Sequence, residues 1–401
     1  MIIGDAAACR GLDPAGALLE LRKFVAPEFV FGPGAADLAG RYARNLGLER
    51  ALVVTDPGVI EAGWTGRTLD ALRLEGLEYV VFSDVSPNPR DEQVMAGAAF
   101  FASQGCDGIV AVGGGSPMDC AKGIAIVSSH DRNILEFEGV DKVERPSPPL
   151  ICCPTTAGSS ADVSQFAIIT DTTRKVKVAI VSKATVPDTA LVDPVLTTTM
   201  DRELTVNTGL DALTHAVEAY VSNANAPVTD LFALEAVRLI SANLDHVADD
   251  LGNLELRAKV MLGSMYAGLA FSNAILGAVH AMAHSLGGLK DLPHGQCNAI
   301  LLDHVMAYNF AAQPERYKAI GRAMGAVLPP GMPDAEARDV VLDAVRGFKR
   351  TLGMTATLSD LGVTEADLDR LAAMALQDPC MATNPVCPDC VDVAAIYRSA
   401  L

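Results

Sequence analysis

The chain has 401 residues, 50% of them apolar and 20% charged, a composition typical of a folded protein with two or three domains. Its formal net charge of −18 disfavours partners that present a phosphate backbone or an anionic lipid surface. We therefore expect neither nucleic acid nor a membrane as a partner. The N-terminus lacks a basic segment followed by an apolar one, and the nine cysteines are an odd number. Both features predict a cytoplasmic protein with reduced thiols.

Short apolar runs dominate the first half of the chain, at residues 50–56, 78–85, 106–115 and 149–158. An amphipathic helical pattern lies between the first two runs, at residues 63–75. Strands separated by helices predict βαβ units and a parallel sheet. Because the runs are apolar almost throughout, we expect helices on both faces of this sheet. Residues 1–197 are predicted to form this α/β domain.

Long helical patterns replace the short apolar runs from about residue 198 onward, for example at 231–251 and 336–353. We predict an all-α C-terminal domain over residues 198–401, with Pro194 and a threonine-rich loop at the boundary. Residues 261–283 carry no charge and are long enough to span a membrane. Their serines, asparagine and histidine favour a buried central helix of the helical domain instead.

Three glycines, Gly113, Gly114 and Gly115, follow the third apolar run, and Ser116 then opens a helical pattern. Backbone amides of such a loop can approach a phosphate closely, and the positive end of the helix dipole attracts the anion. The serine can cap the helix or donate to the phosphate. The alternative is a plain tight turn between a strand and a helix.

Two further polar features follow strands of the same predicted sheet. Residues 154–160 (PTTAGSS) offer hydroxyl groups in a loop after the fourth run, and Asp56 ends the first run. Polar loops at the carboxyl edge of a parallel sheet indicate a ligand bound across that edge, and an acid there can accept hydrogen bonds from ribose hydroxyls. The alternatives are a Ser/Thr turn without function and an aspartate that only caps a helix.

Histidines cluster in the second half, where His280, His284 and His294 lie within fifteen residues. His215 lies apart from them and follows Asp211 by four residues, so these two side chains share one face of a helix. A lone histidine on an apolar helix is usually a hydrogen-bonded core residue. An aspartate with several imidazoles suits a divalent ion of the Fe²⁺ or Zn²⁺ type, so we predict a metal site here.

Three cysteines near the C-terminus, Cys380, Cys387 and Cys390, raise the possibility of half a zinc site. The chain has no second CxxC pair to complete such a site. We therefore favour a thiol cluster that holds no metal.

These features together resemble the iron-containing (group III) alcohol dehydrogenase family over nearly the whole chain, from FGPGAADLAG at 31–40 to TNP at 383–385. The segments that carry the resemblance are GGGSPMDCAK, PTTAG, GLDALTHAVEAYVS and HAMAHSLGGLKDLPHG. The resemblance implies a dinucleotide-binding N-terminal domain, a metal-binding helical domain, and NAD with one divalent metal as cofactors. Iron is the expected metal and zinc the alternative.

The resemblance also implies roles for individual residues. Asp211, His215, His280 and His294 match the metal ligands of the family. His284 matches a histidine that does not bind the metal and lies beside the nicotinamide, and Asp56 matches the acid at the adenosine ribose that favours NAD over NADP. Further matches to nucleotide-contacting positions are Asn88, Gly114, Gly115, Ser116, Asp119, Thr155, Thr156 and Lys177.

The loop after PTTAG departs from the family pattern, PTTAGTGSEVT. Ser160 replaces a glycine, Ala161 a serine and Asp162 a glutamate. Because this loop of the family faces the nicotinamide, we place Ser160 together with Phe271 in the substrate pocket. Because of this departure, one alternative interpretation is a catalytically inactive sensor or regulator with the same fold. A second alternative is an enzyme of the glycerol-dehydrogenase or dehydroquinate-synthase type.

The resemblance predicts hydride transfer between a short-chain primary alcohol, or its aldehyde, and NAD. The metal would lower the pKa of the substrate hydroxyl, and His284 or a water would carry the proton away. It also predicts a homodimer or a larger homo-oligomer.

Overall fold

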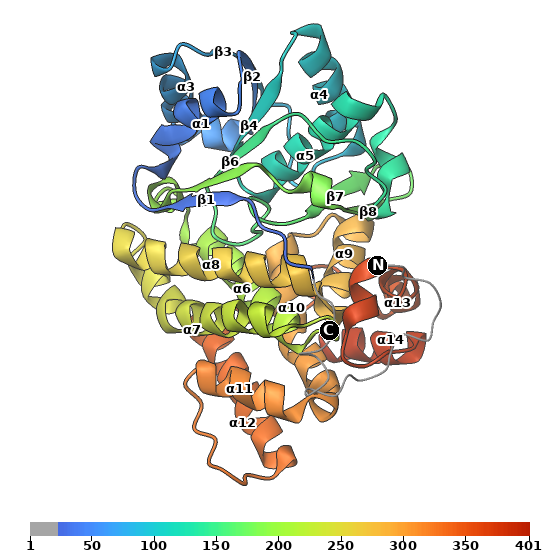
Figure 1. The fold of residues 1–401 in the computed structure, drawn as a ribbon. Coiled ribbons are helices and arrows are strands. Elements are labelled where there is room, and N and C mark those ends of the chain that lie inside the picture. The colour runs from blue at the N-terminus through green and yellow to red at the C-terminus, as the bar shows by residue number, and fades with distance from the viewer. Residues whose placement is uncertain (1–22) are drawn as a thin grey trace.

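The computed structural model describes residues 23–401, which form an α/β part and a helical part stacked one on the other (Figure 1). All six strands of the main sheet are parallel, in the order β1-β9-β6-β4-β2-β3. The strands are β1 (Glu28–Phe31), β2 (Arg50–Val54), β3 (Glu78–Phe82), β4 (Gly108–Gly113), β6 (Leu150–Pro154) and β9 (Thr189–Val192). The predicted α/β fold with a parallel sheet is confirmed.

Helices cover both faces of this sheet, as the apolar strands predict. Side chains alternate along β2, so that Leu52 and Val54 pack on one side while Ala51 and Val53 pack on the other. The first side is covered by α4 (Asp91–Ser103) and α5 (Gly115–His130), and the second by α1 (Ala39–Asn45) and α3 (Trp64–Leu74). The short helix α2 (Pro57–Glu61) follows β2 directly.

A second sheet was not predicted. It has three strands in the order β5-β8-β7, namely β5 (Gly139–Val140), β7 (Phe166–Asp171) and β8 (Val176–Val181). β7 and β8 form an antiparallel pair, and β8 also contacts α9 of the helical part. The hairpin therefore lies where the two parts of the molecule meet.

The second half is helical throughout, which confirms the prediction. Its helices are α6 (Arg202–Val221), α7 (Pro227–Asp249), α8 (Leu254–Ala274), α9 (Ala278–Lys290), α10 (His294–Asn309), α11 (Pro314–Ala323), α12 (Asp334–Thr351), α13 (Leu368–Ala375) and α14 (Cys390–Ser399). α6, α7 and α8 pack side by side and place their apolar side chains in one large core (Figure 1). The predicted boundary between residues 197 and 198 falls between a 3-10 turn (Pro194–Thr197) and α6.

The uncharged segment at 261–283 is two buried helices instead of the single helix expected. α8 and α9 meet at an angle of 98° across a short break. At this break Ile275 has a φ of 62°, a left-handed conformation that a β-branched residue rarely adopts. Over residues 23–401, no single helix is long and apolar enough to cross a membrane. The bent pair α8 and α9 is long and apolar enough only when its two helices are taken together.

Within residues 23–401, Cys387 differs from the expectation of reduced thiols. Cys387 is disulfide-bonded, so it does not form a thiol cluster with Cys380 and Cys390. Cys380 is a buried free thiol, whereas Cys390 is a free thiol exposed at the start of α14.

Candidate active site

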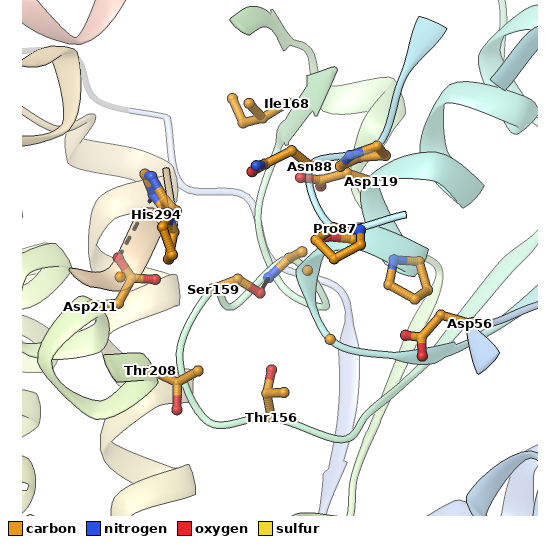
Figure 2. Close-up of a pocket in the computed structure, with 18 of the residues that line it drawn as sticks. Asp56, Pro87, Asn88, Asp119, Thr156, Ser159, Ile168, Thr208, Asp211 and His294 are labelled. Carbon is orange, nitrogen blue, oxygen red and sulfur yellow. Dashed lines mark hydrogen bonds and ion pairs between the residues drawn. The ribbon is translucent and has the colours of Figure 1, made fainter. Parts of the chain in front are cut away.

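One cavity of about 880 Å³ lies between the carboxyl edge of the main sheet and the helices α6, α9 and α10 (Figure 2). With one exception, every site residue proposed from the sequence lines it. These residues are Asp56, Asn88, Gly114, Gly115, Ser116, Asp119, Thr155, Thr156, Lys177, Asp211, His215, Phe271, His280, His284 and His294. The fold thus brings the glycine loop and the histidine cluster to opposite walls of one cleft. Figure 2 shows Asp211 and His294 on one side of this cleft and Asp56 on the other.

The glycine loop leads directly into a helix. Gly114 is the N-cap of α5, and Ser116 is the second residue of that helix. A Cβ atom at Gly115 would lie 2.9 Å from the Oγ atom of Ser159, and one at Gly114 would lie 3.2 Å from the Oγ1 atom of Thr156. Only residues without a side chain allow the two loops to approach this closely. Exposed amides at a helix start suit a phosphate group.

Ser160 is the exception, and its placement in the substrate pocket was wrong. The Ser160 side chain is 4% exposed and points into helix α8, where its Oγ atom donates to the Ser264 carbonyl at 2.7 Å. Its φ of 49° is a left-handed conformation, which explains why glycine suits this position. Its neighbours Ser159 and Ala161 line the cavity instead.

Asp56 both lines the cavity and caps a helix. Its Oδ1 atom accepts a hydrogen bond from the Val59 amide at 3.0 Å, at the start of α2. The helix-cap alternative considered for this residue is therefore present in the structure. One carboxylate oxygen is used by the cap, so the other can still accept hydrogen bonds from a ligand.

Asn88 and Asp291 connect the two walls of the cleft. The Asn88 amide nitrogen donates to the Asp291 Oδ1 atom at 2.9 Å, across the gap between the end of β3 and the end of α9. Asp119 and Lys177 also line the cavity, where burial raises the pKa of Asp119 to about 6 and lowers the pKa of Lys177. These groups place polar side chains along the cleft from the glycine loop towards the histidines.

The four predicted metal ligands come from three helices and meet at one point. Asp211 and His215 lie on consecutive turns of α6, His280 lies in the first turn of α9, and His294 begins α10. Asp211, His215 and His280 have potential ligand atoms within 4.8 Å of one another. The Nε2 atom of His294 lies 3.7 Å from the Asp211 Oδ1 atom (Figure 2).

Burial sets the charge state of this cluster. It lowers the pKa of His215 to about 3 and the pKa of His294 well below its usual value. Burial opposes ionisation of Asp211 too, but the surrounding histidines lower its pKa strongly. Asp211 is therefore ionised and the imidazoles of His215 and His294 are neutral, which are the forms that bind a metal ion. At His280 burial also opposes the charge, but hydrogen bonds to Asp211 and Glu218 outweigh it and raise the pKa of His280 to about 9, so a metal ion would have to displace the proton from this ring.

Two buried residues that support the cluster were not predicted from the sequence. The Glu218 Oε2 atom lies 2.6 Å from the Nδ1 atom of His280. The amide nitrogen of Asn298 lies 2.6 Å from the Asp211 Oδ1 atom and 3.0 Å from the Nε2 atom of His280. Glu218 follows His215 by three residues, so its position on the same face of α6 was the one available signal.

His284 has a partner of its own. Its Nδ1 atom lies 2.8 Å from the Oδ2 atom of Asp378, and both side chains are nearly buried. The His284 ring stacks on His294 with centroids 5.3 Å apart. His284 therefore lies beside the cluster of predicted metal ligands, and because its Nδ1 atom contacts Asp378, its Nε2 atom is left for a ligand.

Comparison with known proteins gives the same family for both halves of the chain. Residues 26–194 match the iron-containing alcohol dehydrogenase model, and residues 205–401 match the C-terminal model of the Fe-containing alcohol dehydrogenase family. The 1,3-propanediol dehydrogenase of Klebsiella pneumoniae is 43% identical over 92% of this chain and 96% of that protein. The NAD-dependent methanol dehydrogenase of Bacillus methanolicus is 35% identical over 94% of this chain and 99% of that protein.

A crystal structure of a 1,3-propanediol oxidoreductase has the same fold. It is 41% identical, covers 95% of this chain and 100% of that chain, and superposes with a TM-score of 0.92. The likeness therefore extends through both the sheet and the helical part.

Proposed function

This chain belongs to the iron-containing alcohol dehydrogenase family, and on that premise we propose how its residues carry out NAD-dependent oxidation of an alcohol or reduction of an aldehyde. The observation that carries the proposal is the single cavity in which a glycine loop faces an aspartate and three histidines. A dinucleotide along one wall would present its nicotinamide to a substrate held at the other.

We assign the metal site to Asp211, His215, His280 and His294. The donor set fits a borderline divalent ion, because it combines one carboxylate with imidazoles. Two buried nitrogens in this set, the Nδ1 atoms of His215 and His294, have no hydrogen-bond partner within the described part of the chain. Iron is the proposed metal and zinc the alternative. When bound, a divalent ion polarises the substrate hydroxyl and lowers its pKa.

The dinucleotide is proposed to run from Asp56 to His284. The amides of Gly114 and Gly115, at the start of α5, would bind the pyrophosphate. The free carboxylate oxygen of Asp56 would accept from the adenosine ribose and repel the extra phosphate of NADP. Asp56→Gly should therefore raise the use of NADP relative to NAD, and an unchanged ratio would reject this role.

We propose His284 as the residue that takes up the substrate proton. An ionised Asp378 can only accept a hydrogen bond, so the Nδ1 atom of His284 carries the proton between them. The Nε2 atom then has a free lone pair within the cleft and can accept a proton from a hydroxyl group. The proton moves onward to solvent, directly or through water.

The substrate proposed is a short-chain primary alcohol or the corresponding aldehyde. Phe166, Ile168, Phe271 and Leu276 are apolar side chains that line the cavity. Relatives of this chain are a 1,3-propanediol dehydrogenase and a methanol dehydrogenase, so small alcohols and diols are the first compounds to test. Of the three departures in the loop that raised the possibility of an inactive protein, Ser160 and Asp162 are buried outside the cavity lining, and Ala161 lines the cavity.

The test is metal analysis of the purified protein combined with an alcohol and aldehyde panel followed by NADH absorbance. We expect about one divalent ion per chain and turnover that a strong chelator abolishes. Turnover that persists after complete metal removal would overturn the metal assignment. Binding of NAD and metal without turnover of any compound would overturn the proposed substrate class.

We also propose a homodimer or larger homo-oligomer, consistent with the exposed apolar side chains of Val228 and Leu231 on α7. Light scattering of the purified protein measures this directly, and a monomeric mass would reject it. The cytoplasmic location predicted from the sequence stays a prediction.

A further inference from the structure

Glu218 is a buried carboxylate that the proposed chemistry does not use directly. It is 4% exposed and lies on α6, the helix that also carries Asp211 and His215. Its Oε1 atom accepts from the Val279 amide at 2.6 Å, and its Oε2 atom lies 2.6 Å from the Nδ1 atom of His280. A buried carboxylate is costly unless its oxygens are satisfied, and here both are.

These contacts fix which nitrogen of His280 carries the proton. An ionised carboxylate only accepts hydrogen bonds, so the Nδ1 atom must donate to Glu218. On the opposite side of the ring, the Nε2 atom lies 3.0 Å from the amide nitrogen of Asn298. That amide nitrogen also faces the Asp211 Oδ1 atom at 2.6 Å, which requires it to be a donor. In the neutral imidazole with its proton on Nδ1, the Nε2 atom is an acceptor, as a metal ligand must be.

Glu218 also joins the helices that carry the ligands. The first turn of α9 is held through its backbone, with the Val279 amide on Glu218 and the Ala278 amide on the Oδ1 atom of Asn384 at 3.1 Å. A Cβ atom at Gly277 would lie 3.0 Å from the Glu218 Oε1 atom, so glycine permits this close approach. Through Glu218, the position of His280 is coupled to that of Asp211.

We propose that Glu218 is a positioning residue for the metal site, holding His280 in the tautomer and orientation that direct its Nε2 atom at the ion. The inference rests on the proposed metal ligands. A carboxylate that accepts from the far nitrogen of a ligating histidine commonly accounts for a 10–100-fold difference in metal affinity.

The test is Glu218→Gln, with Co²⁺ as the probe ion. A glutamine has nearly the same shape, and its carbonyl oxygen can still accept from the Val279 amide. Its NH₂ group then faces the Nδ1 atom of His280 and favours the tautomer with the proton on Nε2, which cannot bind a metal. We expect Co²⁺ affinity to fall about 10–100-fold in chelator competition, with a changed visible spectrum of the bound ion.

The matched control is Asp378→Asn, which changes the same kind of carboxylate–histidine pair at His284. His284 is not a proposed ligand, so this variant should bind Co²⁺ with unchanged affinity and an unchanged spectrum. NAD affinity and circular dichroism, measured on all proteins, report whether the fold is kept.

Two outcomes would overturn the inference. These are wild-type Co²⁺ affinity in a folded Glu218→Gln variant, and an equal loss of affinity in the Asp378→Asn control. If Glu218→Gln does not fold, the variant to use is Glu218→Asp, which keeps the charge on a shorter side chain. We expect it to bind Co²⁺ more weakly than wild type, and an affinity equal to wild type would reject the role of Glu218. A wild-type protein that binds no Co²⁺ would reject the proposed metal site itself.

Discussion

The two walls of the cleft present different kinds of chemical group. The wall on the sheet side consists of backbone amides and small residues in loops, such as Gly114, Gly115 and Thr156. The wall on the helical side consists of large polar side chains from α6, α9 and α10, held by buried partners such as Glu218. We therefore expect substitutions that add atoms to weaken NAD binding at the first wall, and substitutions that remove atoms to weaken metal binding at the second.

Removing a ligand should have the largest effect. His280→Ala takes away one imidazole of the cluster, so we expect loss of bound metal and a fall in kcat/KM of about 1000-fold, several kcal/mol of transition-state stabilisation. Elemental analysis and NADH absorbance measure the two effects. NAD affinity, which depends on the other wall, should change little. A variant that keeps its metal would contradict the ligand assignment.

Removing the proposed proton acceptor should have a smaller effect. His284→Ala should keep its metal but lose about 100-fold in kcat, because proton transfer by a positioned side chain contributes on that order. The dependence of kcat on pH should change as well. If kcat and its pH profile match those of the wild type, the proton is carried by another group.

Adding one methyl group on the sheet side of the cleft should weaken NAD binding. Gly115→Ala introduces a Cβ atom 2.9 Å from the Cβ and Oγ atoms of Ser159, so the two loops must separate. We expect NAD affinity to weaken about tenfold, or by about 1.4 kcal/mol. Metal content should stay at the wild-type level. Isothermal titration with NAD tests this, and an unchanged Kd would show that the loops tolerate the displacement.

The last expected effect is on the stability of the fold and not on binding or turnover. Burial raises the pKa of Asp162 to about 6, above the value of about 3.9 typical of an unfolded chain. The folded state thus binds this proton more tightly, and stability falls as pH rises from about 4 to 6. Asp162→Asn should remove this loss, worth about 3 kcal/mol, and raise Tm relative to wild type more at pH 8 than at pH 4.5. An equal Tm difference at both pH values would refute the assignment.

The sequence predicted features whose causes are local. Asp211 and His215 are four residues apart on one helix, so helical geometry alone puts them on one face. The apolar strands, each followed by turn residues and a helix, predicted the parallel sheet and placed the glycine loop at its carboxyl edge. These features depend on interactions between near neighbours, which the order of residues displays.

Other features depended on packing between distant segments. The contact of Glu218 with His280 joins residues 62 positions apart, and that of Asp378 with His284 joins residues 94 positions apart. Apart from the spacing of Glu218 three residues after His215, their sequence neighbours contain nothing that distinguishes these two acids from other buried acids. The direction of the Ser160 side chain was likewise decided by its φ of 49° and by the Ser264 carbonyl on another helix.

The sequence by itself therefore determined the alternation of strands and helices around the main sheet, the glycine loop and the residues proposed as metal ligands, because periodicity and spacing are local properties of the chain. Only the tertiary structure decided how α8 and α9 bend at Ile275, and which buried carboxylate orients which histidine. The reason is physical: a buried charge needs a partner, and the close packing of distant segments determines which group that partner is.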